Sequence, residues 1–290
     1  MTGHATLELD RFAPINLDGL VSEAALMTRV DRKYVLSQDA AARVVATLDA
    51  GIRVLDVDGA RGFRYESVYF DTPDLLSFRM AAQPRRRRFK LRTRTYVDTR
   101  TAFLELKTRG ARSATVKDRI EYAASDRRLL TDEARGYAAD ALDAIGIGAR
   151  RADDLAVRLT TMYRRATFVS PDGGARSTVD TDLQWLDASG SSLTTPQMAI
   201  IETKSGAAAS EFDRALWRAG HRPVSISKYA TGLAALHPNL PRNKWARVLR
   251  GPFADATRTS RPASEPSAPG RIRRPAPTNR TEETTCVSAA

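Results

Sequence analysis

Eight stretches of the chain alternate polar and apolar residues with a period of two, and this alternation limits the possible folds more than any other feature. Successive side chains of a β-strand point to opposite faces, so such stretches are typical of strands with one buried face. The predicted strands are residues 27–36, 62–71, 86–97, 102–109, 113–123, 156–169, 175–183 and 197–205. Most connections between them are short, which favours an antiparallel sheet or barrel.

Helical segments are predicted between these strands, from capping residues followed by apolar side chains at helical spacing. Ser37, Ser210 and Ser227 are the expected N-caps of three helices, and a further helix is expected over about 131–145. Eight strands are enough to close a barrel. The predicted fold class is therefore α+β, an antiparallel eight-stranded β-tunnel with helices packed outside.

The last part of the chain differs in composition from the rest. From residue 254 onward it is rich in Pro, Ser, Thr and Arg and nearly empty of large apolar side chains. Such a segment buries too little surface to offset the entropy of ordering it. We therefore expect one folded domain over 1–253 and a disordered tail over 254–290.

The charge balance restricts the partners. The formal net charge is +12 and the isoelectric point about 10.2, which favours polyanions. The single cysteine, Cys286, excludes a disulfide framework and a cysteine-based zinc site, and the three histidines match no metal-ligand spacing. No apolar run is long enough to cross a bilayer and no signal pattern is present, so a cytoplasmic location is predicted.

Alternation also predicts which charged side chains share a face of the sheet. In RRRRFKLRTRTY (85–96), Arg88, Lys90, Arg92 and Arg94 share one face. The corresponding rows on other strands are Asp31 with Lys33, Glu105 with Lys107, Lys117 with Arg119, Arg176 with Asp180 and Asp182, and Glu202 with Lys204.

A polar face turned to solvent explains any one of these strands. Their repetition over six strands instead favours a tunnel lined with cations, in which a dense anion such as a linear phosphate chain relieves the repulsion. The minority of acidic side chains would then be available to hold a divalent cation that bridges phosphate oxygens.

Nine motifs occur along the chain in a defined order: DRKY, YFDT, KLRTRTY, FLELKTR, TVKDR, YRRATF, RSTVDT, IIETKS and SISKY. In this order they resemble the VTC domain, the polyphosphate polymerase domain of the vacuolar transporter chaperone family, which is a branch of the triphosphate tunnel metalloenzymes. The resemblance extends from about Met27 to about Leu236. It implies an antiparallel β-tunnel, a divalent cofactor (Mn²⁺ or Mg²⁺), and transfer of the γ-phosphoryl group of ATP to a growing polyphosphate chain with release of ADP.

The resemblance also implies roles for individual residues. The implied catalytic residues are the phosphate-contacting cations Lys33, Arg92, Arg94, Lys107, Lys117, Arg165, Arg176 and Lys228. Glu202 of IIETKS matches the family's metal-binding glutamate, with Asp31 or Glu105 as an auxiliary ligand. Two positions depart from the pattern: Arg29 stands where the wider superfamily has an acid, and Ser225 stands where some relatives have a lysine.

ATP and inorganic polyphosphate are the partners that the resemblance implies. Nucleic acid is not expected, because the basic strands lack interleaved aromatic side chains: Phe89 and Tyr96 lie on opposite faces. Recruitment by a membrane partner stays open. Two alternatives to a polymerase also stay open, a triphosphate hydrolase that uses the same tunnel and a non-catalytic polyanion-binding module.

Overall fold

The computed structural model describes residues 7–23, 30–83, 85–109 and 115–259. All of them belong to one compact unit, Met1–Ser260. The larger part of the predicted tail, residues 260–290, lies outside the described residues, as does Arg29.

All eight predicted strands are confirmed, with shifts of a few residues at their ends. They are β2 (Val30–Ser37), β4 (Phe63–Asp71), β5 (Arg88–Tyr96), β6 (Thr101–Arg109), β7 (Thr115–Tyr122), β8 (Ala156–Val169), β9 (Ala175–Asp187) and β11 (Met198–Ser205). They follow one another in the sheet in the order β2-β11-β9-β8-β4-β5-β6-β7, and every neighbouring pair is antiparallel. The antiparallel α+β class is thus confirmed.

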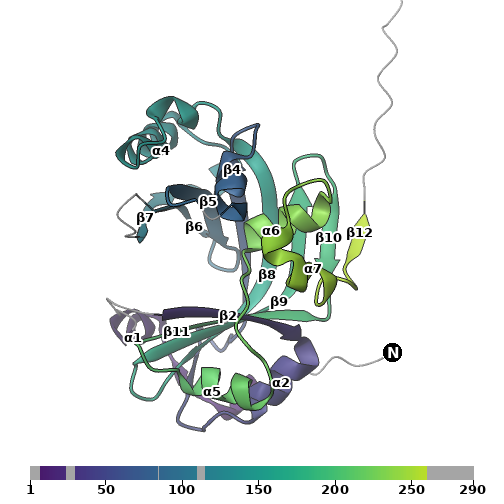
Figure 1. The fold of residues 1–290 in the computed structure, drawn as a ribbon. Helices are drawn as coiled ribbons and strands as arrows, with labels where there is room; N and C mark the ends of the chain where they lie inside the picture. Colours follow the sequence, from purple (N-terminus) through teal and green to yellow (C-terminus); the bar gives the residue numbers. More distant parts are fainter. Residues whose placement is uncertain (1–6, 24–29, 84, 110–114, 260–290) are drawn as a thin grey trace, which may run out of the picture. The chain divides into compact units, whose positions relative to one another are not determined.

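The prediction of a closed tunnel needs correction. Within the described part of the chain, β2 pairs with β11 alone and β7 with β6 alone, so the eight-strand path stays open between its two ends. Figure 1 shows β7 and β11 on the two sides of this opening. Alternation tells which face a side chain occupies, but closure depends on tilt and stagger, which alternation does not report. The sheet is therefore a curved, tunnel-like wall.

Four shorter strands complete the sheet and were not predicted. They are β1 (Ala13–Ile15), β3 (Arg53–Leu55), β10 (Ser192–Thr195) and β12 (Thr257–Thr259). Strands of three or four residues are too short for a period of two to be recognised. Because β12 pairs with β10, the sheet extends beyond residue 253, where the domain was expected to end.

The four predicted helices are present and three were missed. The predicted ones are α2 (Gln38–Ala46), α4 (Asp132–Ala144), α5 (Glu211–Arg218) and α6 (Lys228–Leu236). The predicted caps are confirmed, because the hydroxyl groups of Ser37, Ser210 and Ser227 accept backbone N–H groups of the first turn. The missed elements are α1 (Leu17–Glu23), α3 (Leu76–Ala82), α7 (Ala246–Arg250) and the short 3₁₀ helices Leu9–Arg11, Ala124–Asp126, Ala149–Ala152 and Asn243–Trp245.

Helices pack against both sides of the sheet. One core joins α4 to β5 and β6 through side chains such as Leu91, Leu104 and Leu142. A second joins α2 and α5 to β2 and β11, and a third joins α3, α6 and α7 to β4, β8 and β9. Figure 1 shows α4, α2 and α5 on the outside of the curved sheet, whereas α6 packs on its inner side, where Lys228 donates to Asp180. The charged side chains of the strands share this inner side with the third core.

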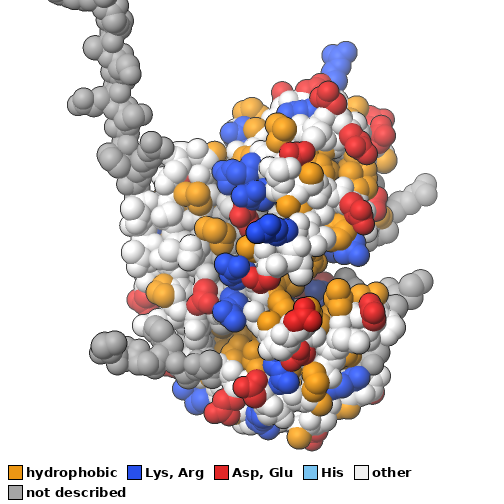
Figure 2. Space-filling model, turned by 180° about the vertical axis from the view of Figure 1, so that it is seen from behind, with side chains coloured by type: hydrophobic (Ala, Val, Ile, Leu, Met, Phe, Trp, Pro, Cys, Tyr) orange, Lys and Arg blue, Asp and Glu red, His pale blue; other side chains and the backbone are white. Residues whose placement is uncertain are grey.

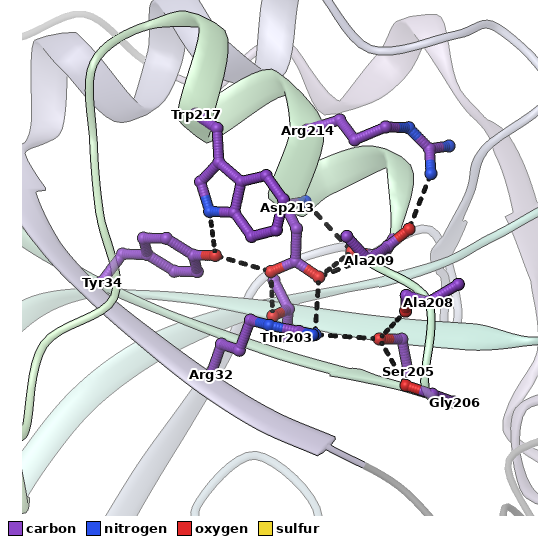
Figure 3. A network of polar contacts seen from close by, with 11 residues as sticks. Arg32, Tyr34, Thr203, Ser205, Gly206, Ala208, Ala209, Asp213, Arg214 and Trp217 are labelled. Carbon is purple, nitrogen blue, oxygen red and sulfur yellow. Dashed lines mark hydrogen bonds and ion pairs between the residues drawn. The ribbon is translucent and has the colours of Figure 1, made fainter.

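A polar network on the outer side of β2 and β11 fixes these two strands to α5 (Figure 3). The buried Asp213 carboxylate accepts hydrogen bonds from the Tyr34 hydroxyl group at 2.7 Å and the Thr203 hydroxyl group at 2.6 Å. It also accepts the backbone N–H of Ser210 at 2.9 Å, which completes the capping box of α5, and lies 3.3 Å from Arg32. Tyr34 and Thr203 point to the outer side of the sheet, whereas the residues next to them along the strands, such as Lys33, point to the inner side. By fixing the two strands, the network therefore also fixes the position of their inner-side residues.

Replacing Asp213 with Ala is expected to cost about 3 kcal/mol of unfolding free energy, because buried hydroxyl donors lose their acceptor. Urea unfolding followed by circular dichroism measures this change. Arg214→Ala is the control: Arg214 is exposed on the same helix and bonds the Ala209 carbonyl, so its loss should change stability by less than about 0.5 kcal/mol. Equal midpoints for the two variants would contradict the anchoring role.

No helix among the described residues is both long enough and apolar enough to span a membrane.

Candidate active site

Three acidic side chains on the inner face of the sheet are each surrounded by cations. The acids are Glu202 on β11, Glu105 on β6 and Asp180 on β9. Figure 2 shows that the molecular surface is hollowed between the part that contains α4 and the part that contains α5. We describe the three clusters in turn, because together they contain most of the predicted site residues.

The first cluster is centred on Glu202. Its Oε1 atom lies 2.9 Å from Lys204 Nζ on the same strand and 3.4 Å from Lys33 Nζ, directly opposite on β2. Burial alone would raise the pKa of Glu202, but the charges of Lys204, Lys33 and Arg165 lower it well below its usual value. Glu202 is therefore ionised at neutral pH and is held in place by two ammonium groups.

The second cluster is centred on Glu105, which is only 4% exposed. Arg92 donates to its Oε2 atom through Nε at 2.9 Å and Nη2 at 2.6 Å, and Arg94 Nη2 lies 3.6 Å from the same atom. Lys117 Nζ lies 3.5 Å from Oε1. Burial opposes ionisation of Glu105, yet the charges of Arg92 and Lys117 keep its pKa below the usual value.

The third cluster is centred on Asp180, which is 0% exposed. Arg165 forms a fork with this carboxylate, Nε to Oδ1 at 2.6 Å and Nη2 to Oδ2 at 2.8 Å. Lys228, the first residue of α6, donates to Oδ2 from the other side. The rings of Tyr65 and Tyr163 lie 5.1 Å and 5.2 Å from the Arg165 guanidinium group. Asp180 thus orients two of the predicted cations.

Lys90 is an additional cation on this face. Alternation predicted its face, but no role was assigned to it. Its Nζ donates to the Ser227 hydroxyl group at 2.9 Å, at the N-terminus of α6. Burial and the charges of Arg92, Lys107 and Lys33 lower the pKa of Lys90 to about 7. Lys90 is therefore partly neutral at physiological pH.

The three clusters belong to one electrostatic site. Arg165 of the third cluster lowers the pKa of Glu202 in the first, and Glu202 raises the pKa of Lys90, which lies beside Arg92 of the second. The two remaining predicted cations lie on the same face: Lys107 faces Lys90 and Lys117 in register, and Arg176 faces Lys204. All nine predicted site residues thus lie on the inner side of the sheet.

One prediction from alternation fails at a particular position. Asp182 was expected on the face of Asp180, but its backbone has a φ of 54° and its side chain is exposed. The register between β8 and β9 shifts close to this point, between Met162 and Arg164, so a β-bulge breaks the alternation. Glu105, one of the two alternatives for an auxiliary ligand, belongs to the cluster of Arg92, and its role toward a metal ion stays a prediction.

The site could supply some, but not all, of the ligands that a divalent cation needs. Among the described residues, no three His, Cys, Asp or Glu side chains are grouped so that they could hold a metal ion. Both ion pairs of Glu202 end on Oε1. Mg²⁺ is commonly bound through one or two carboxylates together with substrate phosphates. Glu202 therefore fits an ion that takes its other ligands from a bound phosphate chain.

Comparison with known families gives one match over most of the chain. The family model described as VTC domain matches residues 28–237. This range contains all nine predicted site residues. It also contains all eight strands of the path that runs from β2 to β7. A comparison with curated proteins finds no match.

Comparison with solved structures gives distant matches. A proposed adenylyl cyclase from Hippeastrum, described as having a dominant triphosphatase activity, has a TM-score of 0.46 and 15% identity, covering 75% of this chain and 100% of its own. A proposed adenylate cyclase from Vibrio parahaemolyticus has a TM-score of 0.40 and 14% identity, covering 71% and 98%. A conserved protein from Pyrococcus furiosus has a TM-score of 0.33 and 13% identity, covering 66% and 87%. These scores are too low for an activity to be carried over.

Proposed function

Because the chain belongs to the VTC domain family, we propose that it is a polyphosphate polymerase, which transfers the γ-phosphoryl group of ATP to a polyphosphate chain and releases ADP. The observation that supports this most is the inner face itself, where three carboxylates hold basic side chains in fixed positions. Phosphoryl transfer requires mainly positioning and charge neutralisation from a protein. An array of oriented cations supplies both.

We assign the roles of the cations from their chemistry. The guanidinium groups of the site would bind phosphate oxygens through forked hydrogen bonds; they belong to Arg92, Arg94, Arg165 and Arg176. The ammonium groups would neutralise charge on the transferred phosphoryl group and on the leaving oxygen; they belong to Lys33, Lys107, Lys117 and Lys228. The terminal phosphate of the acceptor is already ionised, so the reaction needs no general base.

Glu202 is the residue that would hold a divalent cation, Mn²⁺ or Mg²⁺, and Asp31 faces Lys204 close by. When bound, such an ion would polarise the phosphate oxygens and offset their charge. Lys33 and Lys204 would then exchange their ion pair with Glu202 for contacts with phosphate. Binding of the phosphate chain would in this way release the Glu202 carboxylate to hold the divalent cation.

The direct test of the proposed function is incubation of the protein with ATP and Mn²⁺, followed by separation of the products. Phosphate chains longer than the triphosphate, formed together with ADP, support the polymerase. Formation of ADP and free phosphate alone would identify a triphosphate hydrolase instead. Binding of polyphosphate without turnover would identify a non-catalytic polyanion-binding module. A cytoplasmic location stays a prediction, and recruitment by a membrane partner stays open.

The affinity for tripolyphosphate is expected to fall as the pH rises above about 7, where free Lys90 loses its proton. A bound phosphate favours the charged ammonium form, so binding raises this pKa toward its usual value of about 10.4 and takes up a proton between the two values. Full affinity is therefore expected below pH 7, with a loss of up to about tenfold per pH unit above it.

Isothermal titration calorimetry from about pH 6 to about pH 9 measures this effect, and the matched variant is Lys90→Met. The variant should lack this component of the pH dependence, whereas the ionisation of the ligand itself affects both proteins equally. Parallel affinity profiles for the two proteins would show that Lys90 does not contribute.

A further inference from the structure

The YFDT motif supplies none of the cations of the site, yet its aspartate, Asp71, is fully buried. Asp71 is the last residue of β4, and its carboxylate accepts the backbone N–H groups of Ser77 at 2.8 Å and Phe78 at 2.9 Å, in the first turn of α3. It also accepts the hydroxyl group of Tyr229, the second residue of α6, at 2.5 Å. Asp71 therefore ties the end of one strand to two helices that are far apart in the sequence.

The partners of Asp71 are uncharged, in contrast to those of the site acids Glu202, Glu105 and Asp180. Among the described residues its carboxylate accepts only N–H and O–H groups, and Arg158 donates to its backbone carbonyl instead. Burial raises the pKa of Asp71, and these donors offset part of the increase. An apolar contact would join β4 to α6 without burying a charge. What the hydrogen bond adds is a fixed direction.

The two residues that precede Tyr229 both lie in the site. Ser227 accepts a hydrogen bond from Lys90 Nζ at 2.9 Å. Lys228 donates to the carboxylate of Asp180. Because all three residues lie at the start of α6, the position of Ser227 and Lys228 depends on how this helix is rotated about its own axis.

Helix α6 is held at two points on different strands. Trp185 on β9 donates its Nε1–H to the Lys228 carbonyl at 2.8 Å, and it lies so close to Gly232 that a Cβ atom there would overlap its ring. The second point is the hydrogen bond of Tyr229 to Asp71 on β4, and β8 lies between β4 and β9 in the sheet. One contact would leave the helix free to rotate, whereas two contacts on separate strands define its rotation.

Tyr229 also supports the cluster of Glu105. Its ring stacks on Tyr69 with the centroids 5.1 Å apart, and the Tyr69 hydroxyl group accepts a hydrogen bond from Arg92 Nη1 at 3.1 Å. Arg92 is the arginine that holds Glu105. One buried tyrosine is thus the neighbour of Lys228 along the chain and packs against the side chain that contacts Arg92.

We propose that Tyr229, oriented by Asp71, is a positioning residue that directs Lys228 toward a bound phosphate. The inference rests on the proposed function, because it takes phosphate to be the ligand of Lys228. When a phosphate oxygen replaces Asp180 as the partner of this ammonium group, the tie of Tyr229 to Asp71 keeps its backbone in place. Less conformational freedom then has to be lost on binding. The YFDT and SISKY motifs accordingly act together, one supplying Asp71 and the other both Tyr229 and Lys228.

The experiment is a double-mutant cycle on the affinity for tripolyphosphate, measured by isothermal titration calorimetry on the full chain at one pH and one ionic strength. The variants are Tyr229→Phe, Lys228→Met and the two combined. Phenylalanine keeps the ring that stacks on Tyr69 and removes only the hydroxyl group that binds Asp71. Lys228 is one of several cations of the site, so its loss leaves an affinity that can be measured.

The matched control is Tyr122→Phe, which removes the same hydroxyl group from another contact between a strand and a helix. Tyr122 on β7 donates to the Leu129 carbonyl at 2.8 Å and accepts the N–H of Thr131, the N-cap of α4, at 3.1 Å. It packs against the core beneath α4. Urea unfolding of every variant, followed by circular dichroism, reports whether each is folded under the conditions of the titration.

The Tyr229→Phe change is expected to weaken tripolyphosphate binding about fivefold or more in the wild-type background, and less than about twofold in the Lys228→Met background. A residue that merely stabilises the fold would show the same loss in both backgrounds. An equal loss in both, no loss in the wild-type background, or a loss in Tyr122→Phe as large as that in Tyr229→Phe would overturn the inference.

The outcome separates this inference from the proposed function. A wild-type protein that binds tripolyphosphate and forms no polyphosphate from ATP, but shows the coupling between Tyr229 and Lys228, would retain the positioning role and exclude the polymerase. A wild-type protein that forms polyphosphate while the two substitutions act independently on binding would retain the polymerase and exclude the positioning role.

Discussion

The Arg165→Met variant is expected to lose about 3 kcal/mol of unfolding free energy, the largest stability effect among the site residues. Arg165 provides both bonds of the fork to Asp180, a carboxylate with 0% exposure. Removing the guanidinium group leaves this buried charge with Lys228 as its remaining ion-pair partner. Burial without sufficient compensation is more costly than the ion pair itself is stabilising.

Urea unfolding of Arg165→Met and Arg164→Met tests this expectation. Arg164 is the neighbouring residue on the opposite face of β8 and is exposed, so its loss should cost less than about 0.5 kcal/mol. Adding Asp180→Leu to Arg165→Met should restore part of the lost stability, because both buried charges of the fork are then absent. Similar unfolding midpoints for the two single variants would show that the fork does not stabilise the fold.

The Glu202→Gln variant is expected to lose more than about 100-fold in metal-dependent turnover of ATP, the largest effect on activity. Replacing groups that merely orient a metal ligand typically costs about 10–100-fold, and Glu202 is the ligand itself in the proposed site. Tripolyphosphate binding in the absence of metal should be retained or strengthened. The amide removes a negative charge from the site and releases Lys33 and Lys204 from their ion pairs.

The matched control is Glu66→Gln. Glu66 is also a strand carboxylate in an ion pair, at 3.2 Å from Arg127 Nε, but it alternates with the site-facing residues of β4. This variant should keep wild-type turnover. Equal activities of Glu202→Gln and wild type would exclude the proposed metal ligand, whereas loss of both turnover and anion binding would indicate that Glu202 is needed for the integrity of the site.

The long strands of the fold could be predicted from the sequence, because each shows the period of two over eight residues or more. Helix α3 could not. It begins after Leu75, whose φ is 55°, and no adjacent side chain caps it. Its first N–H group, that of Leu76, donates to the Thr72 hydroxyl group, and those of Ser77 and Phe78 donate to Asp71 at the end of β4. A cap supplied from the preceding strand leaves no local signal.

The faces of the site could also be predicted, but the partners of the charged residues could not. Alternation placed Arg92 and Glu105 each on the correct face, and the register of β5 and β6 then brought them opposite one another. The pairing of Asp180 with Lys228 depends on where α6 packs, which no local pattern reports. Lys90 lay on the predicted face, and what distinguishes it is the burial and the neighbouring charges that lower its pKa.

The open ends of the strand path have a consequence for the solution behaviour of the protein. Strands β2 and β7 each have an edge that no other described strand covers, and such edges can pair with other molecules and aggregate. Both edges carry charges, Asp31 and Lys33 on one and Lys117 and Arg119 on the other, and edge charges oppose that pairing. Neutral substitutions at Lys33 or Lys117, which we assign to phosphate binding, are therefore expected to reduce solubility as well as binding.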